Sequence, residues 1–468
     1  MGISLGRTDE MARNSGSHWA IVGGGMLGLT LALRLRQQGK SVTVLEAAPQ
    51  LGGLAAAWQV GGITWDRHYH VTLLSDSALR GLLRELDLDG DIDWKITRTG
   101  FYAGGRLFPM SNALEYLRLP ALGMLDKMRI AATIVRGSRI RDWKRLENLP
   151  VEDWLVSLSG RRAFEKLWLP LLRAKLGESY RETNAAFIWA TIQRLYAARK
   201  TGLKREMFGT VRGGYARVLE RFEQRLSSTG VEIRCGARVE RIAAGPAGRP
   251  VIECAGRAPE MFDGIVVTAA PPIASRLCPG LEPQEAERLK AIRYQGIVCA
   301  SLVLSRPLAG YYLTYITDSD CPFTAIIEMT TLVDPGQLDG KTLVYLPKYV
   351  HASDPFFALS DEEVRNRFLT ALERMIPEFQ RQDVLAFRIS RVPAVFPIPT
   401  LRYSEQLPPR ASSLPGLYWV SSANIVNGTL NVNETVQLAE ETAQWLGGLP
   451  AAPAPSEARA GIPEQARA

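Results

Sequence analysis

The sequence has few cysteines and histidines and no long apolar run. Its five cysteines form no Cys-x-x-Cys pair and stand at Cys235, Cys254, Cys278, Cys299 and Cys321. An odd number without that spacing argues against a disulfide framework and favours reduced thiols. No apolar run reaches the about 18 residues that a transmembrane helix needs, and the first residues lack the apolar core of a signal peptide. We therefore expect a cytoplasmic protein.

Other patterns are absent as well. The sequence contains no Ser–His–Asp arrangement, no phosphate-binding P-loop and no basic surface interleaved with aromatic residues, which argues against nucleic-acid binding. The net charge of +8 is modest for 468 residues and indicates a solvated surface, while permitting an anionic partner. That length predicts two or three domains. We expect a mobile tail over residues 1–17 and a disordered, Pro- and Ala-rich tail over 449–468.

A glycine-rich turn near the N-terminus is the most informative motif. Apolar residues 20–22 predict a strand, and Gly23, Gly25 and Gly28 follow it at the start of an apolar helix. In a dinucleotide site the first glycine makes the tight turn, the second lets the backbone approach a pyrophosphate, and the third allows close packing of helix and strand. The complete strand–turn–helix context predicts a dinucleotide-binding fold.

The residues after the second predicted strand choose between cofactors. Glu46 lies 18 residues beyond Gly28, where it would accept hydrogen bonds from a ribose, and an acid there disfavours the 2′-phosphate of NADP. Gly52 and Gly53 add bare backbone near the same edge. This Glu-x5-Gly-Gly extension resembles the FAD signature of the flavin amine oxidase, protoporphyrinogen oxidase and phytoene desaturase superfamily. The resemblance implies an FAD-dependent oxidoreductase.

The resemblance extends over nearly the whole chain and implies an α/β fold. In that superfamily a discontinuous Rossmann-type FAD-binding domain carries an inserted α+β substrate domain. Here Gly213-Gly214-Tyr215, Val239 (implied to contact the adenine) and the strand near residues 264–270 match its middle piece. We expect the FAD-binding domain at residues 18–75, 205–295 and 405–448. We expect the substrate domain at 76–204, as helices, and at 296–404, as a mixed or antiparallel sheet with a helix at about 361–375.

The C-terminal motif departs from the superfamily pattern. The usual Ala-Gly-Asp is replaced by Ser422-Ala423-Asn424, so that Asn424 would contact the ribityl-phosphate without a charge. Asn433 begins the closing helix, whose N-terminus would stabilise negative charge on the reduced flavin. Because no cysteine follows Cys321, a C-terminal thioether link to flavin is excluded and FAD is expected to bind non-covalently.

The segment from Trp65 to Val71 concentrates candidate catalytic groups. It holds His68 and His70, two of only four histidines, where relatives place a turn beside the flavin. Imidazoles there would transfer protons near neutral pH, and Tyr69 between them would contact substrate. One histidine facing the core and one bonding a loop is the competing interpretation. No further ligands that would complete a metal site are evident nearby.

Four further residues are weaker candidates. Lys348 lies where amine-oxidase relatives place a lysine near flavin, although a surface lysine explains it as well. Arg173, with Lys175 two residues on, would face an anionic substrate group or cap a helix. Arg402 and Tyr403 lie where relatives line the cavity near the flavin.

A basic, partly amphipathic segment spans residues 119–146. It would rest on an anionic membrane surface at the inner face of a membrane, or form a buried helix with a charged outer face. Its basic residues are Lys127, Arg129, Arg136, Arg139, Arg141, Lys144 and Arg145.

The sequence predicts oxidation of a small apolar or amine-type substrate by hydride transfer to flavin N5, with oxygen or a quinone as the electron acceptor. Two alternatives stay open. One is a non-redox sugar isomerisation like that of UDP-galactopyranose mutases, and the other is a non-catalytic flavin-binding protein. The substrate and the oligomeric state are not predicted.

Overall fold

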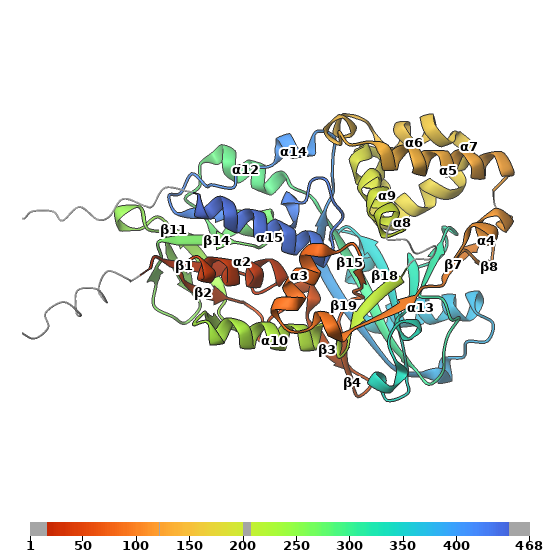
Figure 1. Cartoon of the computed structure of the whole chain (residues 1–468), viewed down its shortest axis with the longest axis horizontal. Helices are drawn as coiled ribbons and strands as arrows, with labels where there is room; N and C mark the ends of the chain where they lie inside the picture. The colour runs from red at the N-terminus through yellow and green to blue at the C-terminus, as the bar shows by residue number, and fades with distance from the viewer. Residues whose placement is uncertain (1–15, 121, 200–206, 449–468) are drawn as a thin grey trace, which may run out of the picture.

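The computed structural model describes residues 16–120, 122–199 and 207–448. The expected tails at 1–17 and 449–468 lie outside these ranges, apart from residues 16 and 17. Figure 1 shows two main parts, with one sheet and its helices on the left and a larger sheet with a helical cap on the right.

A five-stranded parallel sheet forms the centre of the first part. In spatial order its strands are β10 (Glu232–Arg234), β2 (Ser41–Leu45), β1 (His18–Val22), β14 (Gly264–Val267) and β20 (Leu417–Trp419). All neighbouring strands pair in parallel, with Val22 opposite both Leu45 and Val267. Strands from three separate stretches of the chain therefore build one sheet. This arrangement confirms the predicted discontinuous Rossmann-type fold.

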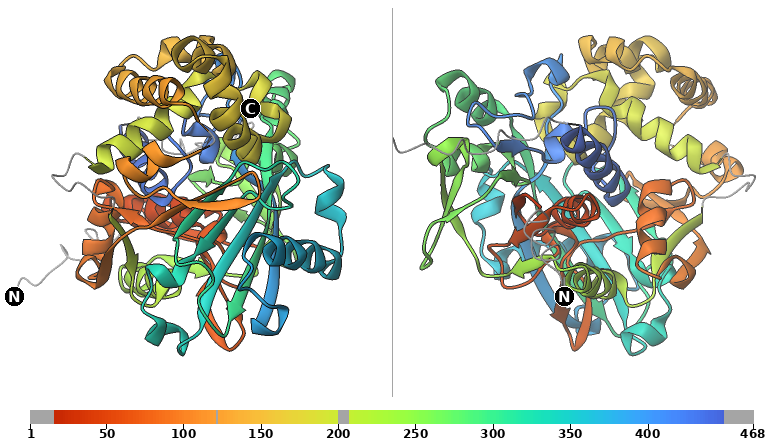
Figure 2. Two further views of the ribbon diagram at one scale, coloured as in Figure 1. Left: turned by 90° about the vertical axis from the view of Figure 1, so that its right-hand side faces the viewer. Right: turned by 60° about the vertical axis from the view of Figure 1, so that its left-hand side comes forward.

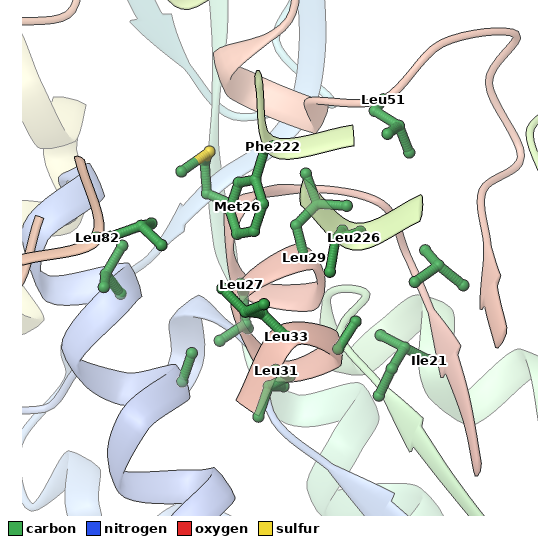
Figure 3. Packing of buried hydrophobic residues seen from close by; sticks show 14 of the residues in the cluster. Ile21, Met26, Leu27, Leu29, Leu31, Leu33, Leu51, Leu82, Phe222 and Leu226 are labelled. Carbon is green, nitrogen blue, oxygen red and sulfur yellow. The ribbon is translucent and has the colours of Figure 1, made fainter. Parts of the chain in front are cut away.

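Helices cover one face of this sheet around the buried helix α2. They are α2 (Met26–Gln37), α3 (Ser77–Glu85), α10 (Gly214–Ser228) and α15 (Val432–Gly447). The first two turns of helix α2, residues 26–33, are buried on all sides, which explains why they carry apolar or small side chains all round rather than along one stripe. Figure 3 shows Phe222 and Leu226 from α10 and Leu82 from α3 beside the α2 leucines. This packing holds the start of α2 against the sheet.

The opposite face carries smaller elements. They are the antiparallel strands β11 (Val239–Ala243), β12 (Val251–Cys254) and β13 (Glu260–Met261), with helices α11 (Pro271–Leu277) and α12 (Pro283–Ala291). Strands β10 and β11 follow each other in the chain but belong to different sheets, because β10 pairs with the distant strand β2 and β11 pairs with β12.

A seven-stranded mixed sheet forms the second part. In spatial order its strands are β19 (Val384–Pro397), β15 (Tyr294–Leu304), β18 (Thr342–Val350), β17 (Ala325–Glu328), β16 (Leu313–Ile316), β7 (Thr99–Ala103) and β8 (Arg106–Pro109). Helix α13 (Asp361–Met375) packs on one face, which confirms the helix predicted there. A serine–glutamate capping box of Ser360 and Glu363 sets its start.

A helical cap lies beside this sheet. Its helices are α4 (Ala113–Arg118), α5 (Met124–Arg139), α6 (Val151–Ser159), α7 (Arg161–Ala163), α8 (Leu169–Leu176) and α9 (Ala185–Arg199). Both views of Figure 2 show these orange-to-yellow helices together above the large sheet. Helix α8 contacts β16 and β18, so the cap reaches the sheet through α8.

The segment 76–109 differs from the expected helical pattern. Helix α3 packs on α15, and strand β6 (Ile92–Ile96) pairs with β9 (Met207–Val211), which also pairs with β5 (Thr72–Leu73). Strands β7 and β8 join the large sheet through β16. These short strands are stabilised by partners far away in the sequence, so their local pattern is weak.

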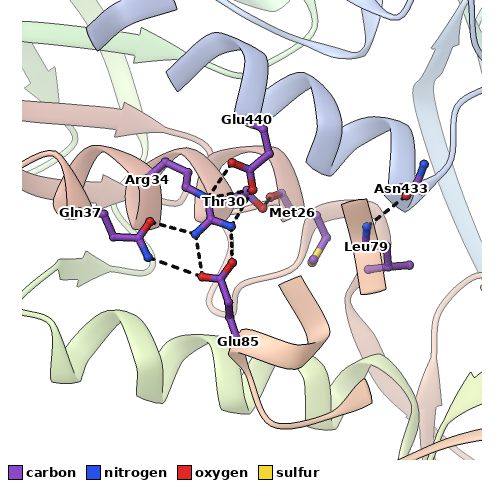
Figure 4. A network of polar contacts seen from close by, with 8 residues as sticks. All are labelled: Met26, Thr30, Arg34, Gln37, Leu79, Glu85, Asn433 and Glu440. Atoms are coloured by element: carbon purple, nitrogen blue, oxygen red, sulfur yellow. Dashed lines mark hydrogen bonds and ion pairs between the residues drawn. The ribbon is translucent and has the colours of Figure 1, made fainter. Parts of the chain in front are cut away.

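A network of polar side chains ties α2 to its neighbours. Arg34 of α2 donates from Nε to both carboxylate oxygens of Glu440, at 2.8 and 2.7 Å, and from its two terminal nitrogens to Glu85, at 2.7 and 2.6 Å. Gln37 accepts a further bond at 3.0 Å. Figure 4 shows one guanidinium joining α2, α3 and α15.

We expect Arg34→Met to lower the free energy of unfolding by about 1–2 kcal/mol, because two partly exposed carboxylates lose a charged donor. Arg34 lowers the pKa of Glu85 by hydrogen bonding, so the difference from wild type should shrink as the pH falls through that lowered pKa. Urea unfolding of both proteins measures it. Arg145→Met, which breaks an ion pair whose side chains are 87% and 57% exposed, is the control. Equal losses in the two variants would contradict the account.

Candidate functional site

The first turn of the chain brings bare backbone to the end of strand β1. Gly23 donates its N–H to the Leu45 carbonyl at 2.9 Å and has a φ of +117°. A Cβ on Gly23 would lie 2.3 Å from the Thr268 hydroxyl oxygen. A Cβ on Gly28 would lie 2.0 Å from the Gly23 carbonyl oxygen, which is backbone and cannot swing away. Both positions therefore require glycine.

Helix α2 begins without a side-chain cap. Its N-cap residue is Gly25, and no acidic side chain occupies its first turn. The second glycine pair lies alongside, because Gly52 donates its N–H to the Gly24 carbonyl at 2.8 Å and Gly52 forms a bridge with Gly25. Uncapped N–H groups beside side-chain-free backbone are what the pyrophosphate of a dinucleotide requires.

Glu46 lies beside the glycine cradle formed by Gly23, Gly25, Gly28, Gly52 and Gly53. Its carboxylate accepts the N–H groups of Gly24 and Ala48, each at 2.7 Å. The turn before β11 runs next to it, since Ala237 donates to the Glu46 carbonyl at 2.9 Å. Val239, two residues further, is buried. The fold thus brings Glu46 and the start of β11 with Val239 to the same end of the parallel sheet, and their contacts with a ribose and an adenine stay predictions.

Two tyrosines hold the C-terminal turn that follows β20. Asn424 accepts the N–H of Ser421 with its side-chain oxygen at 3.0 Å, so this oxygen closes the turn. Tyr403, on α14 (Tyr403–Gln406), is buried and donates its hydroxyl to the Ala423 carbonyl at 3.0 Å. Tyr294 contacts the Ser422 hydroxyl at 3.1 Å. The hydroxyl of Tyr403 therefore braces this turn, and the substrate contact expected from the sequence stays a prediction.

Asn433 joins two helices. Its side-chain oxygen accepts the N–H of Leu79 at the start of α3, at 3.1 Å, as Figure 4 shows. The N-cap of α15 is Asn431, which accepts the N–H of Glu434 at 3.1 Å. The start of α15 is therefore capped by a different asparagine from the one singled out in the sequence.

His68 is buried with one ring nitrogen unused. It follows the hairpin of β3 (Ala57–Val60) and β4 (Ile63–Asp66), and its Nδ1 lies 3.2 Å from the Leu54 carbonyl oxygen. Burial lowers the pKa of His68 to about 4, so the ring is neutral at pH 7. A carbonyl only accepts, hence Nδ1 carries the proton and Nε2 is a bare acceptor. Nε2 is buried without a partner in the described part of the chain.

His70 faces a carboxylate. Its Nδ1 lies 3.6 Å from Asp66 Oδ2, and its ring lies 4.8 Å from the Tyr215 ring. Asp66 accepts the Tyr215 N–H at 2.7 Å with its other oxygen and receives the Tyr345 hydroxyl on its backbone carbonyl. Buried side-chain nitrogens without partners among the described residues gather in this stretch. They belong to Trp58, Trp65, Arg67, His68 and His70.

Tyr69 belongs to a buried aromatic cluster that the sequence revealed only in part. Its hydroxyl lies 2.8 Å from that of Tyr349 on β18, and burial raises the pKa of Tyr69 well above its ordinary value. Lys175 on α8 holds its Nζ 3.8 Å from the centre of the Tyr349 ring and 4.8 Å from that of Phe396. The structure therefore brings Lys175 to Tyr69.

The spacing of apolar residues along α8 indicates on which face of the helix Lys175 lies. Residues 172, 175 and 176 share one helix face, and Leu172 and Leu176 are buried, so Lys175 lies on the inner side. Arg173 points the other way. Its side chain is 46% exposed and pairs with Glu178 at 2.9 Å. Arg173 lies in the last turn of α8, where a cation favours the helix C-terminus, so the capping alternative fits its position.

Two other sequence candidates lie away from this cluster. Lys348 alternates with Tyr349 along β18, so it projects to the opposite sheet face, where its Nζ lies 5.9 Å from the centre of the Phe356 ring. Arg402 is 67% exposed and pairs with Glu405 at 3.9 Å. We therefore assign no catalytic role to Lys348 and no substrate contact to Arg402.

Comparison with known proteins identifies the family. The model of the flavin containing amine oxidoreductases matches residues 27–444. The chain belongs to this family. Membership confirms the predicted superfamily and its FAD cofactor, which the glycine cradle fits.

Across the described residues no group of three or more His, Cys, Asp or Glu side chains could hold a metal ion, and no helix is both long and apolar enough to cross a membrane.

Individual relatives are more distant. The chain is 25% identical over 316 residues to the coproporphyrinogen III oxidase of Mycobacterium tuberculosis, covering 62% of this chain and 66% of that protein. It is 29% identical over 187 residues to the carotenoid phi-ring synthase of Streptomyces griseus, of which it covers 36%. It thus spans one to two thirds of these relatives.

Solved structures show the same fold at low identity. Putrescine oxidase bound to putrescine superimposes with a TM-score of 0.70 at 17% identity, covering 92% of this chain and 99% of that one. Reduced UDP-galactopyranose mutase gives 0.70 at 14% identity, covering 92% and 96%. Likeness at this level shows the fold alone.

Proposed function

We propose that this protein is an FAD-dependent oxidoreductase that removes hydrogen from a small apolar or amine-type substrate. The observation that carries the proposal is the buried, unpartnered Nε2 of His68, in the segment that follows the glycine cradle. Bound FAD, held non-covalently, supplies the hydride acceptor of the reaction. Oxygen or a quinone would then take the electrons. An oxidase is among the relatives of this chain, which supports oxidation as the reaction class.

In this proposal His68 accepts the substrate proton. A neutral imidazole with its proton on Nδ1 has one free acceptor, and the bond to the Leu54 carbonyl keeps that acceptor in a fixed orientation. His70 lies two residues further along the chain, with its Nδ1 3.6 Å from Asp66 Oδ2. The hydroxyl pair of Tyr69 and Tyr349 would orient the substrate. These residues bind, orient and carry protons.

Anaerobic mixing tests the reaction class. FAD-loaded protein is mixed with a carotenoid precursor, a porphyrinogen and a diamine, and the flavin absorbance is followed. We expect one class to bleach the flavin. Turnover of a UDP-sugar only after reduction with dithionite would instead favour the mutase-type isomerisation, for which the structure supplies only the shared fold.

We further propose that the helical cap rests on an anionic membrane surface. Five large apolar side chains of α4 and α5 are 44–63% exposed, namely Leu114, Leu117, Met124, Leu125 and Met128. Exposed basic residues accompany them, namely Arg118, Arg129, Arg136 and Arg139. Lys127 is not among these, because it is buried and donates to the Leu117 carbonyl at 2.7 Å. Apolar side chains flanked by arginines suit the headgroup region of an anionic bilayer.

The double substitution Leu125→Asp and Met128→Asp should weaken binding to anionic vesicles at least about tenfold, because two inserted side chains are lost and two negative charges added. Vesicle flotation with phosphatidylglycerol and phosphatidylcholine measures it. Leu385→Asp, at a residue 52% exposed on β19, is the matched control. Unchanged flotation of the double variant would contradict the membrane contact.

A further inference from the structure

Lys175 is a deeply placed ammonium without a carboxylate partner. No acidic side chain forms an ion pair or hydrogen bond with it anywhere in the described residues. Its contacts are two aromatic rings, with Nζ 3.8 Å from the centre of Tyr349 and 4.8 Å from that of Phe396. Burial lowers the pKa of Lys175, and the nearby Tyr69 opposes this lowering only in part. The positive charge of Lys175 is therefore weakly compensated.

The surroundings explain why the charge stays in place. Leu172 and Leu176 flank it along α8 and are buried, and the aromatic rings of Tyr349 and Phe396 hold its Nζ on this inner face. Ring faces attract a cation but do not satisfy its hydrogen-bond donors. Asp66, a carboxylate in the same site, is already bonded to the Tyr215 N–H and faces His70. Lys175 therefore has unused donors near Tyr69.

A ligand that binds beside Tyr69 would lie close to the Lys175 ammonium. A carboxylate would supply the partner that the protein withholds, in a charge-assisted hydrogen bond. A protonated amine would bring a second positive charge beside an uncompensated one. A neutral ligand would leave the charge of the Lys175 ammonium without a partner.

We infer that Lys175 is a specificity-determining residue that binds a carboxylate of the substrate, so that the substrate is an apolar molecule carrying a carboxylate and not a cationic amine. The inference rests on the proposed function and narrows its substrate class from apolar or amine-type to carboxylate-bearing. It assigns to Lys175 the anion contact that Arg173, exposed on the other face of α8, does not make.

Three probes of one chain length test this assignment. Decanoate, decanol and decylamine are titrated into FAD-loaded protein, and binding is read from the perturbed flavin spectrum. We expect decanoate to bind tightest and decylamine weakest. Lys175→Met should weaken decanoate about 10- to 100-fold, as expected for loss of a charge-assisted contact, and leave decanol within about threefold. Lys175→Arg should retain the order of the three probes.

Arg173→Met is the matched control, because it removes a cation two residues away that faces solvent, and all three affinities should stay unchanged. If Lys175→Met fails to fold, Lys175→Gln replaces it with the same expectation. Decanoate bound equally by wild type and Lys175→Met, or tighter binding of decylamine by wild type, would overturn the assignment. The titration needs no turnover. Decanoate binding through Lys175 with no substrate reducing the flavin would sink the proposed function and leave this inference standing.

Discussion

Gly28→Ala is expected to weaken FAD binding at least about 100-fold, equivalent to about 2.7 kcal/mol. The new Cβ would lie 2.0 Å from the Gly23 carbonyl oxygen, so helix α2 and the turn must separate by about 1 Å to reach an ordinary contact. That movement takes the uncapped N–H groups of α2 away from the pyrophosphate. Titration of the apoprotein with FAD measures the loss, and circular dichroism checks that the variant folds.

Gly81→Ala is the matched control for this prediction. Gly81 lies in α3, in the same part of the molecule, and a Cβ there meets no atom within 4 Å. The substitution should leave FAD affinity unchanged and, if anything, stabilise the helix slightly. Wild-type FAD affinity in Gly28→Ala would show that the cradle does not hold the cofactor as described.

His68→Ala should slow substrate reduction of the flavin about 10²- to 10⁴-fold while FAD stays bound. The reason is loss of the one buried Nε2 that the bond to Leu54 keeps free to accept a proton. A base works only when deprotonated, so the wild-type rate should be level at neutral pH and fall as the pH drops through about 4. Rapid anaerobic mixing at several pH values measures both effects.

His351→Ala serves as the control for His68, because His351 is exposed and bonds only to nearby Ser353 at 2.7 Å. Its rate should match wild type. A His68→Ala protein that reduces as fast as wild type would remove His68 from the mechanism. A rate that rises as the pH falls would instead require a protonated His68.

The glycine cradle could be predicted from the sequence because its parts are local. Gly23, Gly28 and Glu46 occupy one strand–helix–strand unit whose spacing follows from backbone geometry. The segment with His68 and Tyr69 could also be singled out from the sequence, because two of the four histidines are concentrated there. The tautomer of His68 could not be predicted, since it depends on the carbonyl of Leu54, fourteen residues earlier.

The positions of other site residues depend on packing between segments that are distant in the sequence. Lys348 and Tyr349 are neighbours in the chain, yet the alternation of β18 places them on opposite sheet faces, and the sequence pattern did not show which face meets the site. Lys175 reaches Tyr349 from a helix that only the folded cap brings to the sheet. Tyr403 is predicted to line the cavity from the resemblance alone, and its bond to the Ala423 carbonyl could not be predicted, because that turn lies twenty residues further along the chain.

The central claim is that this chain holds FAD and reduces it with electrons from a carboxylate-bearing apolar substrate. Reconstitution followed by anaerobic titration tests it most directly. The account predicts that the protein binds one FAD per chain and that acid releases this FAD intact. It also predicts that the flavin absorbance is bleached in step with the formation of a product that has lost two hydrogens. A protein that binds no added FAD, or one whose bound flavin is bleached by a diamine and by no carboxylate-bearing substrate, would contradict it.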